Sequence, residues 1–221
     1  MGTAIGASLP YATAAALSPI PITAVTLILL ARHGFASSLF VAGRLFSYAF
    51  VLTGVVVLSD LIRPGTDAAP SGLGVALRIV LGAIAVGAGI WTWVGRSSER
   101  ESTAPTRWAR VTDRITPTRG AALGVALSAG PKSVLLLAGG GLALAGARVS
   151  WTGEAVAVLV FLAVAGSTVL VPVILYYAFG ARALKGLRRL QGWMQTDGVT
   201  ISALLLILVG VVLIGSGIVG L

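Results

Sequence analysis

The sequence predicts an all-α integral membrane protein of six transmembrane helices, arranged as two inverted three-helix repeats. Three observations support this fold class. Of the 221 residues, 57% are hydrophobic and 10% are charged, whereas soluble domains carry about 25% charged residues. Several uncharged stretches are long enough to cross a bilayer, which takes roughly 20 apolar residues. A short proline-containing motif also occurs twice, at an offset of 110 residues.

The first predicted span, 1–31, has no charged residue before Arg32. It is too long, and too interrupted by Pro10, Pro19 and Pro21, for a cleavable signal peptide. The five later spans are expected at 37–59, 74–95, 120–147 (interrupted by Lys132 alone), 155–179 and 198–221. Lipid offers no hydrogen-bond partners to the backbone, so spans of this length predict a helical bundle and a single membrane domain, 1–221.

The basic residues predict the orientation of this bundle. If the first, third and fifth connections are cytoplasmic, Arg63 and Arg148 lie outside and eleven basic residues lie inside. These eleven are Arg32, Arg96, Arg100, Arg107, Arg110, Arg114, Arg119, Arg182, Lys185, Arg188 and Arg189. The positive-inside rule therefore predicts a multi-pass membrane protein with both termini extracytoplasmic.

A basic cytoplasmic loop, 96–119, separates repeat 1 (1–95) from repeat 2 (120–221). The stretches 106–115 and 183–194 each place apolar residues on one helical face and basic residues on another. Such stretches either recognise an anionic lipid or a cytoplasmic partner, or lie in the membrane interface and anchor the bundle.

The repeated motif reads ALSPIPIT at 16–23 and ALSAGPKS at 126–133. The offset pairs Ser18 with Ser128, Pro21 with Pro131, and Thr23 with Ser133. Three spans per repeat give the two halves opposite orientations, which is the plan of secondary transporters whose interrupted helices form the binding site. Proline removes a backbone donor, so we expect open helix around Ile20 and around Gly130–Pro131. Alternatively, the prolines are kinks that only shape the packing.

The candidate substrate-binding residues come from these two motifs and one neighbouring span. They are Ser18, Pro19, Pro21, Thr23, Arg44, Ser128, Gly130, Pro131, Lys132 and Ser133. Lys132 lies about midway along its span, where a charge costs roughly 2.5–3.5 kcal/mol on insertion scales and indicates function by default. It would bind a carboxylate, phosphate or sulfate group; alternatively it contacts carbonyls freed by the break, or snorkels. Arg44 and Arg78 lie nearer to span ends, where snorkelling accounts for them.

Several site classes have no support in the sequence. There are no cysteines and one histidine, so we expect no thiolate or histidine metal site and no cofactor. Ser18 and Ser128 lack a partner base for nucleophilic catalysis, and we expect no enzymatic activity. No phosphate-binding glycine motif follows a predicted strand, and topology explains the basic residues better than nucleic-acid binding.

Four segments carry a resemblance to a known family: LSPIPITAVTLILLA, SAGPKSVLLLAGG, VPVILYYAFG and the closing ALLLILVGVVLIGSGI. Together they resemble the GAP family, the peptidoglycolipid- and sulfolipid-addressing proteins of actinobacteria, within the lysine-exporter superfamily. The family's usual Asn-Pro-Lys is Gly130-Pro131-Lys132 here, so the asparagine contacts are lost. The resemblance implies a six-span inner-membrane protein that takes part in the export of envelope glycolipids.

The sequence thus favours a secondary transporter or exporter of an anionic or lipid-linked envelope component. Two alternatives remain: an accessory scaffold of a larger lipid-export complex that transports nothing itself, and an exporter of amino acids or other small solutes. The expected partners are membrane lipids, an anionic lipid or small-molecule substrate, and larger lipid-export machinery. An oligomer is compatible with the sequence.

Overall fold

The computed structural model describes residues 2–62, 72–99, 115–147 and 149–218. Every element in these ranges is a helix, which confirms the predicted all-α class. In chain order they are α1 (Gly2–Ala16), α2 (Pro19–Leu30), α3 (Gly34–Ile62), α4 (Gly72–Glu99), α6 (Pro117–Ser128), α7 (Pro131–Gly146), α8 (Trp151–Phe179), the 3₁₀ turn η1 (Gly180–Arg182) and α9 (Ala183–Ile218).

Four of these helices are long and apolar enough to cross a membrane. The qualifying segments are Gly34–Ser59, Val75–Gly95, Trp151–Phe179 and Thr200–Ile218, close to four of the predicted spans. The other two predicted spans correspond to bent pairs, in which α1 and α2 meet at 53° and α6 and α7 meet at 68°. The described residues therefore contain four to six candidate spans, which fits a multi-pass membrane protein.

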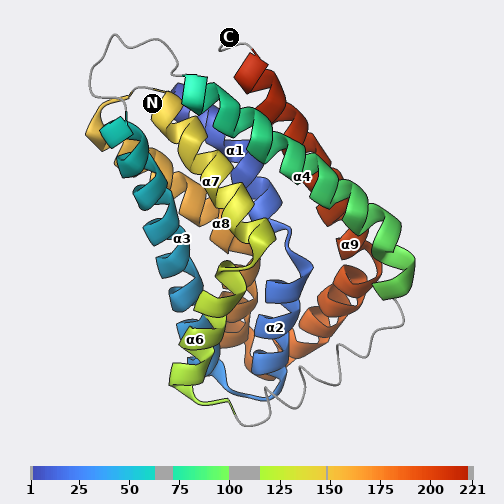
Figure 1. Cartoon of the computed structure of the whole chain (residues 1–221). Helices are drawn as coiled ribbons and strands as arrows, with labels where there is room; N and C mark the ends of the chain where they lie inside the picture. The colour runs from blue at the N-terminus through green and yellow to red at the C-terminus, as the bar shows by residue number, and fades with distance from the viewer. Residues whose placement is uncertain (1, 63–71, 100–114, 148, 219–221) are drawn as a thin grey trace.

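The bundle is built around α1, α3, α7 and α8 (Figure 1). Helix α1 packs against α7 and α8, and α3 packs against α6, α7 and α8. Helices α4 and α9 pack along each other and form a pair at one side of the bundle (Figure 1). A Cβ atom on Gly82 would lie 2.8 Å from the carbonyl oxygen of Gly210, so these two helices meet where neither has a side chain.

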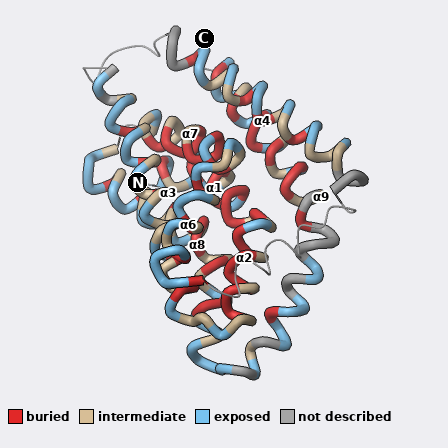
Figure 2. Tube along the Cα trace, turned by 60° about the horizontal axis from the view of Figure 1, so that its bottom comes forward, coloured by how far each residue is buried: buried red, intermediate tan, exposed pale blue. Residues whose placement is uncertain are grey.

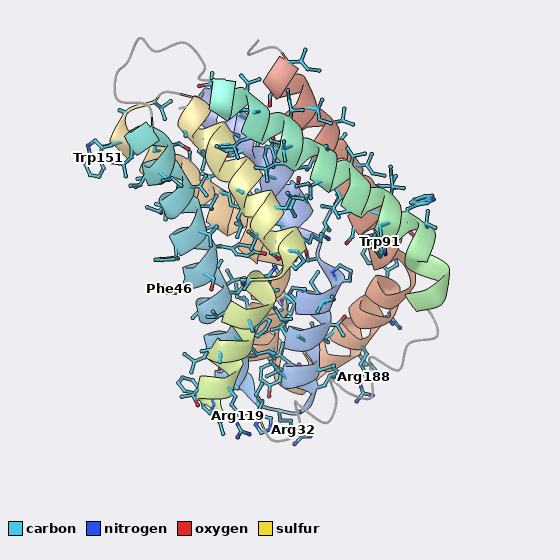
Figure 3. All side chains as sticks on the ribbon, viewed as in Figure 1. Arg32, Phe46, Trp91, Arg119, Trp151 and Arg188 are labelled. Atoms are coloured by element: carbon cyan, nitrogen blue, oxygen red, sulfur yellow. The ribbon has the colours of Figure 1, made fainter. Side chains whose placement is uncertain are left out.

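Two hydrophobic cores lie one above the other inside the bundle, and Figure 2 shows their buried residues along its interior. The first core joins α1, α7, α9, the second half of α3 and the first half of α8. The second core joins α2, the first half of α3, the second half of α8 and the start of α9, with α6 packed against it. The outer surface is also apolar: Phe46, Trp91 and Trp151 are 70%, 82% and 80% exposed (Figure 3), as expected of residues that face lipid.

Exposed basic residues gather at one end of the bundle. Arg32, Arg119 and Arg188 lie at the end opposite the start of α1 and the end of α9 (Figures 1 and 3). The basic stretch 183–194 is the first part of α9, which continues to Ile218 as one 36-residue helix. The other basic stretch and most of the predicted 96–119 loop lie outside the described residues, as do Arg63 and Arg148.

Candidate functional site

The first helix break separates α1 from α2 at Leu17 and Ser18. The α region is disfavoured for a residue before proline, and Ser18, which precedes Pro19, is extended (φ −93°, ψ 114°). Pro19 is the first residue of α2, where its missing N–H would have had no helical partner anyway. The break therefore precedes both prolines, whereas the sequence suggested open helix around Ile20. Pro21 lies inside the first turn of α2 and is buried.

Two hydroxyl groups from other helices satisfy two of the carbonyl groups at this break. Thr168 Oγ1 of α8 donates to the carbonyl oxygen of Ala16 at 2.6 Å. Ser202 Oγ of α9 donates to the carbonyl oxygen of Leu17 at 3.1 Å. Buried carbonyl groups are costly without partners, so these bonds stabilise the break between α1 and α2.

The second break separates α6 from α7 at Ala129 and Gly130. Here Gly130 precedes Pro131 and is extended (φ −60°, ψ 146°), and Pro131 is the first residue of α7. The Ser128 hydroxyl donates back to the Gly124 carbonyl at 2.8 Å. Both breaks thus have the same local cause, a proline at the first position of the second helix segment.

The two breaks lie at the same level, between the two cores. Leu17 and Leu127, the residues before Ser18 and Ser128, both pack against the second core. Figure 1 shows both breaks near mid-height of the bundle. The elements at this level each leave one core and enter the other within a few residues. The change falls between Ala15 and Ile22 in α1–α2, between Val41 and Tyr48 in α3, between Leu127 and Leu135 in α6–α7, and between Ala165 and Val169 in α8. Polar residues occupy this level, and we call them the polar layer: Ser18, Arg44, Ser128, Lys132, Ser133, Thr168 and Ser202.

Arg44 of α3 is the most buried cation of the polar layer, with 1% of its surface exposed. Its Nη2 donates to the Tyr48 hydroxyl, and its guanidinium carbon lies 4.6 Å from the centre of the Tyr48 ring. Nε and Nη1 have no hydrogen-bond partner among the described residues. The expectation that Arg44 snorkels to an interface is therefore wrong: the side chain turns into the bundle.

Close helix packing encloses Arg44. A Cβ on Gly120 of α6 would lie 2.5 Å from the Ala36 carbonyl oxygen of α3, and a Cβ on Gly124 would overlap Phe40 and approach the Arg44 backbone. Small residues allow this approach. Helix α6 therefore covers the part of α3 in which Arg44 is buried.

Lys132 is the second residue of α7 and is half-buried. It lies close enough to Arg44 for the two positive charges to repel each other. Within the described chain, neither a carboxylate nor a carbonyl is bonded to its ammonium group. The N-terminus of α7 adds a partial positive charge of its own. The second break is therefore strongly electropositive.

The other candidate residues divide into two groups. Ser18, Ser128 and Ser133 are buried in the polar layer, at 7%, 2% and 7% exposure. Gly130 and Pro19 are half-buried at the breaks, and Pro131 is exposed there. Pro21 and Thr23 lie further along α2, buried and half-buried respectively, so the structure does not place them at the break.

The sequence did not predict three residues of the site: Tyr48, Thr168 and Ser202. Tyr48 carries a weak signal, because it lies one helical turn after Arg44 and so shares its face. Thr168 and Ser202 each lie near another hydroxyl residue, Ser167 and Thr200 respectively, in an apolar span. Hydroxyl residues in such positions usually bond to their own helix. No group of three metal-binding side chains occurs in the described residues.

The chain matches one family of known proteins over almost its whole length. The family is SfLAP, described as Sap, sulfolipid-1-addressing protein, and the match covers residues 9–219. No curated protein and no solved structure matches the chain. The match includes both helix breaks, Arg44 and Lys132, and it agrees with the resemblance that the motifs carry. The chain therefore belongs to the sulfolipid-1-addressing protein family.

Proposed function

We propose that the protein is a secondary transporter or exporter, not an enzyme, which moves an anionic or lipid-linked envelope component out of the cell. The observation that carries the proposal is the polar layer, where two helix breaks lie at one level together with Lys132 and Arg44. An ionisable side chain at membrane depth indicates a ligand pathway, and two cations favour an anionic ligand. The family description, which names a sulfolipid, supports a lipid-linked one.

An inverted repeat of six spans fits this function. The α1–α2 pair runs toward the basic end of the bundle, and the α6–α7 pair runs away from it (Figure 1). In an inverted repeat, α1 corresponds to α6, α3 to α8 and α4 to α9. The packing of α1 on α8 then corresponds to the packing of α6 on α3, and α4 packs against its own counterpart, α9. Interrupted helices that meet between inverted repeats form the binding sites of secondary transporters. The positive-inside rule then makes the basic end cytoplasmic and both termini extracytoplasmic.

An accessory scaffold is the second candidate, and the basic end of the bundle favours it. Arg119, Arg182, Lys185, Arg188 and Arg189 are exposed there and would attract an acidic partner or anionic lipid. Export of small cationic amino acids fits the site less well, because their charge would meet Lys132 and Arg44 in a low-dielectric interior.

Lipid flux through the purified protein alone tests the proposal. The protein would be reconstituted into phosphatidylcholine vesicles that contain trace fluorescent sulfatide, phosphatidic acid or neutral glucosylceramide. Dithionite bleaching reports how fast each lipid crosses the bilayer. We expect faster crossing of one or both anionic lipids and no change for the neutral lipid.

Lys132→Met keeps the side-chain length and removes the charge, so it should abolish most of this flux. Arg78→Met is the matched control, because Arg78 also lies within a span but approaches Gly146 and the Leu142 carbonyl, away from the breaks. Equal crossing of all lipids by protein-containing and protein-free vesicles would reject autonomous lipid transport and favour the scaffold.

A further inference from the structure

Arg44 carries donors that the fold does not use. The guanidinium has five N–H donors, and the three on Nε and Nη1 have no partner among the described residues although the side chain is 1% exposed. Buried donors and charges of this kind are costly. A ligand with several acceptor oxygens would use them.

Tyr48 fixes the direction of the guanidinium. Its hydroxyl accepts from Nη2, and its ring lies under the guanidinium carbon at 4.6 Å. Tyr48 is itself fully buried in the first core, so the guanidinium cannot turn freely. Nε and Nη1 are held in place with their donors available.

Lys132 supplies a second positive charge from another helix. The two cations come from opposite sides of the α3–α6/α7 packing, and they are near enough to repel each other. A group that lies between them gains from both charges. Two cations and about six N–H donors, counting three on the ammonium, exceed what one carboxylate with two oxygens can accept.

We propose that Arg44 and Lys132 together bind one tetrahedral oxyanion, a phosphate or sulfate group, with Tyr48 as the positioning residue of the guanidinium. Such a group presents at least three acceptor oxygens, and arginine and lysine are its usual ligands. The inference rests on the proposed function, since this group would be the anionic part of the transported component. The anionic group of the transported component would then bind between the second helix break and α3.

Equilibrium binding to the full-length protein in neutral detergent tests the site. Titration with sodium sulfate, sodium phosphate or sodium acetate at constant ionic strength would be followed by calorimetry. The variants are Lys132→Met, Arg44→Lys and Tyr48→Phe, with Arg78→Lys as the matched control. Arg44→Lys retains the positive charge and loses the planar donors, and its folding would be checked by helicity and monodispersity.

We expect one sulfate or phosphate ion per chain and at least tenfold weaker acetate binding. The Lys132→Met and Arg44→Lys variants should each weaken oxyanion binding at least tenfold, Tyr48→Phe should weaken it severalfold, and Arg78→Lys should leave it unchanged. The relative affinities for sulfate and phosphate identify the kind of ester. Should the Arg44 variant not fold, Lys132→Met and Tyr48→Phe decide the outcome.

Three results would overturn the site: no binding by the wild-type protein, acetate bound as tightly as sulfate, or unchanged sulfate affinity in Lys132→Met. A general salt effect of sulfate on stability would appear equally in every variant. Binding and flux are separable: anionic lipid flux that does not need Arg44 or Lys132 would reject this site alone. Lys132-dependent sulfate binding without any flux would reject transport and leave the site standing.

Discussion

Arg44 is the largest of the fully buried side chains in the described part of the chain. Removal of a charge from water costs several kcal/mol even after the protein relaxes. Tyr48 offsets part of this cost through its hydroxyl and its ring. Lys132 adds to the cost, because its charge repels that of Arg44. The pair therefore lowers the stability of the folded protein unless an anion neutralises it.

Lys132→Met should raise the stability of the protein in a buffer without phosphate or sulfate. Methionine removes the repulsion and places a thioether of similar length in the same space, a change typically worth about 1–3 kcal/mol. Thermal unfolding in detergent, followed by circular dichroism, would show a higher midpoint temperature. Lys185→Met, at an exposed position of α9, is the control and should change stability by less than about 0.5 kcal/mol. A lower midpoint for Lys132→Met would make the lysine a structural residue.

At this scale the sequence predicts Lys132 but not the surroundings of Arg44. A lone charge in a long apolar run is visible without coordinates. Whether an arginine near a span end is buried or reaches the membrane interface depends on which face of α3 turns inward and on how closely α6 approaches. That approach depends on Gly120 and Gly124, whose partners lie about 80 residues away along the chain. The bonds from Thr168 and Ser202 to α1 depend on the same kind of distant packing.

At the scale of the helical element, the prolines differ in what they do. Pro19 and Pro131 each begin a helix segment, and each is preceded by an extended residue, the conformation that proline favours at that position. Pro21 is the third residue of α2, and the residue before it is helical. The sequence repeat pairs Pro21 with Pro131, whereas the helix starts pair Pro19 with Pro131. Sequence alignment thus located the breaks to within two residues, because two prolines compete for the same role.

Pro131→Ala should lower anionic lipid flux severalfold without loss of helicity, since Gly130 can then join α6 and α7. Pro19→Ala should have a smaller effect, because the bonds from Thr168 and Ser202 also hold the first break open. Pro21→Ala is the matched control and should retain flux close to that of the wild type. The vesicle assay described above measures all three. Equal flux in all three variants would reduce the prolines to packing features.

The turn between α2 and α3 has an unusual residue at its centre. The Arg32 N–H donates to the Leu29 carbonyl at 3.0 Å, and the His33 N–H donates to the Ile28 carbonyl at 3.1 Å. This is the pattern of a Schellman motif, in which glycine usually occupies the left-handed position. Here Arg32 occupies it, with φ 62°. Arg32, one of the basic residues at this end of the bundle, therefore has a strained backbone conformation.

Arg32→Gly should stabilise the protein by about 1 kcal/mol, because glycine reaches the left-handed region without steric cost. Arg119→Gly removes the same kind of exposed charge from the first turn of α6 and should destabilise by up to about 1 kcal/mol. The two variants lose one positive charge each, so opposite signs separate backbone strain from charge. Thermal midpoints measure both effects. Destabilisation by both variants would contradict the strain at Arg32.

On the scale of the whole molecule, composition and charge predict the class and most of the spans. The four long helices coincide with predicted spans because an apolar run of sufficient length has few alternatives in a membrane. The two cores and the polar layer between them are not visible in the sequence. They arise because each element changes from one core to the other at its own position, and helix packing sets these positions.

The orientation of the whole molecule can be measured by cysteine labelling, because the chain contains no cysteine of its own. Arg119→Cys places one thiol at the exposed start of α6, at the basic end, and Thr152→Cys places one at the exposed start of α8. Figure 3 shows Arg119 and the neighbouring Trp151 at opposite ends of the bundle. The positive-inside rule places the basic end in the cytoplasm.

A membrane-impermeant maleimide added to intact cells should therefore label Thr152→Cys and not Arg119→Cys. After permeabilisation both thiols should react, which controls for accessibility, and the cysteine-free wild type controls for background labelling. Labelling of Arg119→Cys alone in intact cells would reverse the orientation and make the transport direction inferred from it wrong. Labelling of both thiols from outside would contradict the bundle itself, because α6 and α8 would then begin on the same side of the membrane.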